Sequence, residues 1–101
     1  MNSFLSMLGI ARRAGKLVYG FDAVLEQVRK NQAALLVLAA DLSERSRNAF
    51  LLQTKDAKIP CIEPPLTMLD FHNAIGRRSG ILAVCDRGFA NQLISLSALS
   101  D

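Results

Sequence analysis

The chain has 101 residues, which is enough for one domain with a single buried core and too few for two. Half of the residues are hydrophobic and 21% are charged, so the composition excludes a disordered chain and a fibrous repeat. The formal net charge of +3 favours a polyanionic partner.

The longest apolar run covers residues 33–40, far fewer than the roughly 20 residues that a membrane-spanning helix needs. Near the N-terminus the positive charges follow the apolar residues, which is the reverse of a secretory signal. We therefore expect a cytoplasmic protein without a membrane partner. Cys61 and Cys85 form no CxxC motif and the chain has a single histidine, so we expect two buried free thiols and no metal or cofactor.

The first third of the sequence predicts helix, strand and helix. Asn2 can cap a helix that Gly15 ends, and residues 17–19 form a short strand that Gly20 closes. Apolar residues at helical spacing then predict a second helix from Phe21 to about residue 31.

The middle of the sequence predicts a buried strand and a third helix. Residues 33–40 show no polar alternation, as expected of a central strand covered on both faces. Ser43 can cap a helix that reaches about Asp56. Its inward residues are predicted to be Ala49, Phe50 and Leu52.

The last third predicts two more strands and two more helices. Pro60 places the short strand 59–62 at a sheet edge. Thr67 and Asp70 form a capping pattern that begins a fourth helix, with Leu66 packing on Phe71, and Gly76 ends that helix. Residues 81–85 form a strand, and Asp86 caps a final helix. This alternation predicts one α/β domain over residues 1–101, a three-layer α/β/α sandwich around a four-stranded mixed sheet.

Catalytic groups do not converge in this pattern. The one histidine, His72, is expected to be packed or half-exposed on a short helix. No motif places a nucleophile beside it for which it could serve as the base. The protein is therefore predicted to be a binding protein and not an enzyme.

Basic residues near turns and helix ends suggest contacts to phosphates. The helix after Gly20 begins with free backbone N–H groups, a favourable position for an anionic ligand, and Pro64 to Leu66 form a stiff apolar loop that could support an unstacked base. The turn Gly76 to Gly80 has two readings, a phosphate-binding loop or an ordinary helix-to-strand turn. The predicted phosphate contacts are Arg12, Arg13, Lys16, Lys30, Arg77 and Arg78.

Three segments, LGIARRAGKLVYG, LLVLAADLSE and FHNAIGRRSGILAVCDRGFA, resemble the YlxQ-like bacterial branch of the L-seven-Ae ribosomal-protein family, which binds kink-turn RNA. The resemblance extends over nearly the whole chain. It implies an α/β/α sandwich in which the helix start at Gly20, Phe21, Asp22 and Ala23 meets tandem sheared G·A pairs. It also implies that Asp41 lies in a polar RNA-binding loop, and that the loop Pro64, Pro65 and Leu66 covers a flipped base.

The family pattern at the second helix reads roughly Gly-x-Asn-Glu-x-x-Lys, and the corresponding residues here are Gly20, Asp22, Ala23 and Glu26. The main expectation is a non-catalytic RNA-binding protein associated with the ribosome or translation, with structured RNA and ribosomal or translation proteins as its expected partners. The altered turn motivates a second hypothesis, a protein-interaction module on the same scaffold. A small phosphate-ligand enzyme built on Gly76 to Gly80 is the third.

Overall fold

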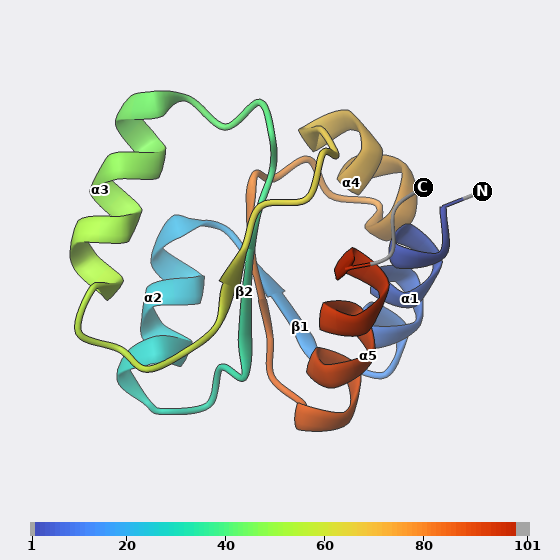
Figure 1. Cartoon of the computed structure of the whole chain (residues 1–101), viewed down its shortest axis with the longest axis horizontal. Coiled ribbons are helices and arrows are strands. Elements are labelled where there is room, and N and C mark those ends of the chain that lie inside the picture. The colour runs from blue at the N-terminus through green and yellow to red at the C-terminus, as the bar shows by residue number, and fades with distance from the viewer. Residues whose placement is uncertain (1, 99–101) are drawn as a thin grey trace.

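The computed structural model describes residues 2–98, in which helices and strands alternate along the chain (Figure 1). None of the helices in this range is long and apolar enough to cross a membrane. The elements are α1 (Ser3–Arg13), β1 (Leu17–Tyr19), α2 (Phe21–Arg29), β2 (Leu35–Leu38), α3 (Glu44–Thr54), β3 (Cys61–Ile62), α4 (Met68–Ile75), β4 (Ile81–Val84) and α5 (Arg87–Ala98).

The four strands form one mixed sheet in the order β1-β4-β2-β3. β4 is antiparallel to both of its neighbours, and β2 and β3 are parallel. The strands β1, β2 and β3 therefore run in one direction and β4 runs in the other. We call the end of the sheet where β1, β2 and β3 finish and β4 begins the upper end, and the opposite end the lower end, as they lie in Figure 1.

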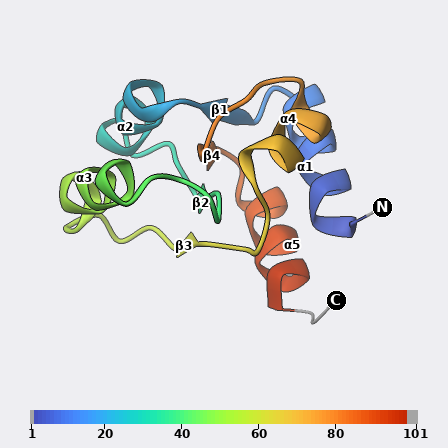
Figure 2. The same ribbon diagram turned by 90° about the horizontal axis from the view of Figure 1, so that it is seen from above.

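Helices cover both faces of the sheet, as expected for the predicted three-layer sandwich. Figure 2 shows α2 and α3 on one side of the strands and α1, α4 and α5 on the other. Alternate residues of β2 supply both cores: Leu35 and Val37 pack with α1, α4 and α5, whereas Leu36 and Leu38 pack with α2 and α3. All four β2 residues are buried, which explains why their sequence shows no polar alternation.

The predicted helix caps are confirmed. Asn2, Ser43 and Asp86 each accept a hydrogen bond from a backbone N–H in the first turn of the following helix. At α4 the Thr67 N–H donates to Asp70 Oδ2 (2.8 Å), and the Asp70 N–H donates to Thr67 Oγ1 (3.2 Å). Because these bonds satisfy otherwise unpaired donors, the helix starts follow from local sequence.

The predicted inward face of α3 is wrong at two of three positions. Phe50 is fully buried, but Ala49 is exposed and the Leu52 side chain is 67% exposed. The buried face passes through Phe50 and Thr54, which lie one turn apart. Ala49 and Leu52 project away from that face because each residue rotates the helix by about 100°.

Other expectations are corrected by the packing. The predicted strands 33–40, 59–62 and 81–85 are shorter in the structure, because their outer residues lie in loops. His72 is exposed, since α4 buries Phe71 and Ile75 instead. Cys61 is exposed on an edge strand and Cys85 is only half-buried, so the expectation of two buried thiols is wrong.

Two of the apolar residues of α3 provide a test of this packing. Phe50→Ala should lower the free energy of unfolding by about 3–5 kcal/mol, because it removes a fully buried ring and leaves a cavity. Leu52→Ala should change it by less than about 0.5 kcal/mol, because the side chain is mostly in solvent. Urea unfolding of both variants measures the difference, and equal losses would contradict the described orientation of α3.

Candidate nucleic-acid interface

Several loops far apart in sequence meet at the upper end of the sheet. The Gly20 N–H donates to the Ile81 carbonyl (3.0 Å), which ties the start of α2 to the start of β4. The Ala39 N–H donates to the Gly80 carbonyl (2.9 Å), and the Ala40 N–H donates to the Leu66 carbonyl (2.7 Å). The start of α2 and the loops 39–43, 64–67 and 76–80 therefore form one continuous surface.

The start of α2 exposes backbone N–H groups that no side chain caps. Gly20 is its N-cap, with φ 99° and ψ 148°, and no side chain caps the first turn. Phe21 anchors this turn because its ring packs edge-on against the Phe50 ring, with centroids 5.7 Å apart. Asp22 and Ala23 are exposed. The positive end of the helix dipole thus opens to solvent beside the Asp22 carboxylate.

The loop between α4 and β4 carries two exposed arginines, Arg77 and Arg78. The Arg77 guanidinium lies over the Tyr19 ring, 5.9 Å from its centroid, which is within the range of a cation–π contact. Because Tyr19 directly precedes Gly20, this contact holds Arg77 near the start of α2. The sequence predicts Tyr19 only as part of a strand. Its aromatic side chain just before the predicted helix start was the signal that could have indicated the contact with Arg77.

Gly76 and Gly80, which flank these arginines, both have structural roles in the turn. Gly76 adopts a left-handed conformation that ends α4. A Cβ at Gly80 would lie 2.8 Å from Leu42 Cδ1 and 3.2 Å from Met68 Sδ, so a larger residue there would require these side chains to shift. These contacts fit the reading of an ordinary helix-to-strand turn, from which the two arginines project.

Asp41 and the loop 64–67 fix the start of α4. Asp41 Oδ1 accepts a hydrogen bond from the Met68 N–H (2.9 Å), so this carboxylate joins the loop after β2 to α4. Of the predicted apolar loop, Pro64 and Leu66 are buried and only Pro65 is exposed. The expectation that all three residues present apolar surface is therefore wrong. Leu66 packs in the same core cluster as Phe71, in agreement with its predicted packing on Phe71.

One cation at the upper end is already neutralised. Arg47 Nε lies 2.6 Å from Glu63 Oε1, and its terminal nitrogen donates to the other carboxylate oxygen (2.8 Å). This bidentate hydrogen bonding lowers the pKa of Glu63 and raises the pKa of Arg47. The pair links α3 to the end of β3 and leaves Arg77 and Arg78 as the cations available beside the start of α2.

Four predicted phosphate contacts lie at the lower end instead. Arg12 and Arg13 end α1, and the Lys16 carbonyl accepts a hydrogen bond from the Cys85 N–H (2.8 Å) where β4 finishes. Lys30 is the C-cap of α2 and pairs with Glu26 (3.5 Å). The nine residues of α2 separate Lys30 from Gly20 by about 13 Å of helix. The structure thus divides the predicted residues between two opposite ends.

The charged residues of the described chain also divide unequally between the two ends of the sheet. The upper end holds Arg45, Arg47, Arg77 and Arg78 against Asp22, Asp41, Glu44, Glu63 and Asp70, a net charge of −1. The lower end has a net charge of +5, and all of its cations are exposed. Its charged residues are Arg12, Arg13, Lys16, Arg29, Lys30, Lys55, Lys58 and Arg87 against Glu26, Asp56 and Asp86.

The chain is thus a three-layer sandwich whose loops gather beyond the ends of three strands. The model of the ribosomal protein L7Ae/L30e/S12e/Gadd45 family matches residues 2–93. The chain therefore belongs to this family.

Two relatives are named RNA-binding protein YlxQ. The protein from Bacillus subtilis (strain 168) is 34% identical over 95 residues, covering 89% of this chain and 90% of its own length. The protein from Enterococcus faecium is 26% identical over 88 residues, covering 87% and 84%. The resemblance to the YlxQ-like branch is thus confirmed.

Two solved structures share the fold. A Bacillus halodurans C protein of unknown function superposes with a TM-score of 0.89 at 27% identity, covering 98% of this chain and all of its own. A Giardia lamblia 15.5kD RNA binding protein superposes with a TM-score of 0.71 at 15% identity, covering 92% and 80%. Together they confirm the α/β sandwich with its four-stranded mixed sheet.

The backbone at Gly20 gives a test of the start of α2. Its φ and ψ lie close to a region that only glycine adopts readily, so Gly20→Asn should cost about 1–3 kcal/mol of unfolding free energy. Gly76→Asn is the matched control, because asparagine tolerates the left-handed helical conformation and should cost less than about 1 kcal/mol. No atom lies within 4 Å of the position that a Cβ would take at either glycine, so the two variants differ in backbone strain and not in steric contacts. Equal losses in thermal or urea unfolding would contradict the described turn.

Proposed function

We propose that this protein binds structured RNA of the kink-turn type, through the upper end of the sheet, as a non-catalytic protein associated with the translation machinery in the cytoplasm. The observation that carries the proposal is the joining of the uncapped start of α2 to the Arg77 loop, through the Gly20–Ile81 hydrogen bond and the Tyr19–Arg77 contact. Membership of a ribosomal-protein family and two relatives named as RNA-binding proteins support it.

In this proposal each part of the surface meets a different part of the RNA. Free N–H groups at the start of α2 approach the RNA backbone, and the Asp22 carboxylate accepts hydrogen bonds from exposed guanine edges. Arg77 and Arg78 bind phosphates. The exposed Pro65 ring supports an unstacked base.

The altered α2 sequence is compatible with this arrangement. Glu26 stands where the family pattern has lysine, but its carboxylate pairs with Lys30 (3.5 Å) toward the other end of the helix. Ala23 leaves the first turn sterically open. The anion at position 26 is thus partly neutralised and lies more than one turn from Gly20.

The distribution of apolar surface favours RNA over a protein-interaction module. The large hydrophobic side chains exposed within residues 2–98 are Ile10, Tyr19, Leu52 and Leu69, and they belong to four different elements. A protein-binding face would gather such residues into one patch. Tyr19 is also partly covered by Arg77.

A salt-titrated binding assay tests the proposal with two RNAs, a kink-turn and the same RNA with its sheared G·A pairs replaced by Watson–Crick pairs. We expect the protein to prefer the intact kink-turn, because the start of α2 reads its shape. In the double variant Arg77→Ala/Arg78→Ala, we expect weaker binding and a salt slope smaller by about two, since two phosphate contacts are lost.

The double variant Arg45→Ala/Lys55→Ala is the charge-matched control, because Arg45 in the first turn of α3 and Lys55 at its C-cap are both exposed and the proposal assigns neither to RNA. Its preference for the kink-turn should equal that of the unaltered protein. Equal affinity for both RNAs would overturn the kink-turn assignment. Binding to neither RNA would overturn the proposal as a whole and favour the protein-interaction module.

A further inference from the structure

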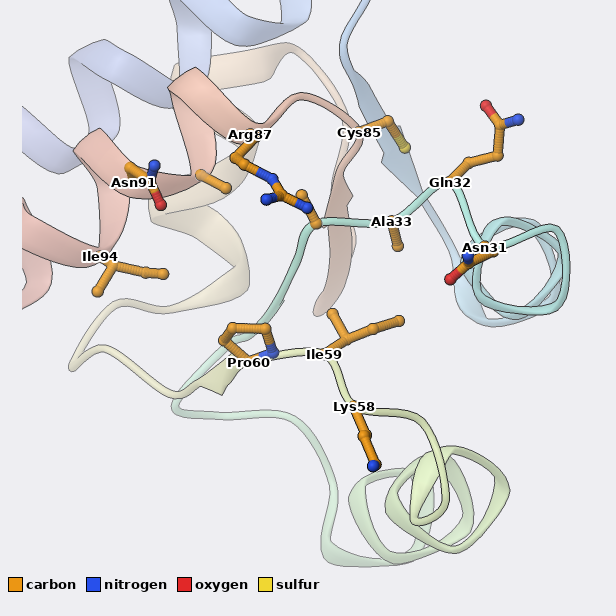
Figure 3. A pocket seen from close by; sticks show the side chains of 12 residues that line it. Asn31, Gln32, Ala33, Lys58, Ile59, Pro60, Cys85, Arg87, Asn91 and Ile94 are labelled. Atoms are coloured by element: carbon orange, nitrogen blue, oxygen red, sulfur yellow. The ribbon is translucent and has the colours of Figure 1, made fainter.

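The lower end of the sheet contains a hollow of about 580 Å³ that the proposed function does not use. It lies between the loop after α2, the segment before β3 and the first turns of α5. Figure 3 shows Arg87 and Asn91 on one wall, Asn31 and Gln32 on another, and Lys58 at the rim.

The chemistry of the hollow is that of an anion site. Its lining includes the cations Lys58 and Arg87 and three side-chain amides, and none of the described lining residues is acidic. Within residues 2–98, neither cation forms a salt bridge or side-chain hydrogen bond. Asp86, which adjoins Arg87, is engaged in capping α5 through the Phe89 N–H (2.8 Å). The two cations therefore remain available for a ligand.

The surroundings extend this site into a broad basic surface. Lys16 lies beside the hollow, because its carbonyl accepts the Cys85 N–H and Cys85 lines the hollow. Arg12, at the end of α1, continues the surface at the same end of the sheet, and Arg13 beside it also lines a hollow with Asp70 and Asn73 of α4. Cations spread over four helix ends suit a polyanion with regularly spaced charges better than one small anion.

From this arrangement we infer that the lower end is a second RNA-binding surface, in which the hollow between Lys58 and Arg87 receives backbone phosphates. The protein would then contact two segments of RNA at opposite ends of its sheet. The identification of the polyanion as RNA rests on the proposed function. The charges also favour it, since the upper end has a net charge of −1 and contributes little long-range attraction, whereas the lower end has +5.

The double variant Lys58→Ala/Arg87→Ala tests the inference against a fully paired RNA duplex without a kink. We expect its affinity for the duplex to fall and its salt slope to decrease by about two, because each cation contacts one phosphate. The charge-conserving variant Lys58→Arg/Arg87→Lys should retain the slope of the unaltered protein. Arg45→Ala, which removes an exposed cation of α3 that neither proposal assigns to RNA, should leave duplex binding nearly unchanged.

The outcomes separate the two proposals. Kink-turn preference together with duplex binding that does not respond to Lys58→Ala/Arg87→Ala would overturn the lower surface and leave the proposed function intact. Duplex binding that does respond, without any kink-turn preference, would support the lower surface alone. Saturable binding of inorganic phosphate in the hollow without duplex binding would overturn the assignment to RNA.

A second measurement needs no change in the hollow itself. Cys85 lines the hollow, and burial raises the pKa of its thiol, so alkylation should be followed at alkaline pH, where the thiolate fraction increases. In a Cys61→Ser protein, saturating RNA duplex should slow alkylation of Cys85. An unchanged rate with bound duplex would contradict occupation of the hollow.

Discussion

The position of β4 determines how the rest of the molecule is arranged. It lies between β1 and β2, pairs antiparallel with both, and all four of its residues are buried. Because β4 alone runs downward, the loop that precedes it reaches the same end of the sheet where β1, β2 and β3 finish. That loop carries Arg77 and Arg78 to the start of α2. A parallel β4 would place them at the opposite end.

In the two proposals, recognition of the RNA fold belongs to the upper end of the sheet and electrostatic attraction of RNA belongs to the lower end. The upper end supplies N–H groups, a shaped turn and two arginines, but its net charge is close to zero. The lower end holds two thirds of the chain's lysines and arginines, including Lys58 and Arg87 beside the hollow. Long-range steering depends on net charge, whereas recognition of an RNA fold depends on local geometry. The two proposals therefore assign these requirements to different surfaces of one small scaffold.

Much of the fold could be predicted from the sequence because the signals are local. Asn2, Ser43, Thr67 and Asp86 cap helices through hydrogen bonds to residues two or three positions away, and the buried strands appear as apolar runs. The orientation of α3 was only partly predictable, since Leu52 is as apolar as its buried neighbours and only tertiary packing distinguishes them.

The candidate site was less predictable, because it depends on strand direction. From the sequence, Lys16 and Lys30 were grouped with Gly20, since all three lie within a short stretch of chain. In the structure β1 and α2 place both lysines at the end of the sheet opposite Gly20. Conversely, Tyr19 and Arg77 are 58 positions apart and meet only through the pairing of β1 with β4. The burial of Pro64 and Leu66 likewise follows from packing that the sequence does not reveal.

Backbone amide chemical shifts, measured during titration with a kink-turn RNA, would locate the RNA-binding surface that we propose at the upper end. The titration should be made at a salt concentration that suppresses binding driven by phosphate charge alone. We expect the largest shifts at residues 20–23, 39–43, 66–68 and 76–80, since Pro64 and Pro65 have no amide proton. Shifts confined to the lower end, or spread evenly over the helices, would contradict this proposal.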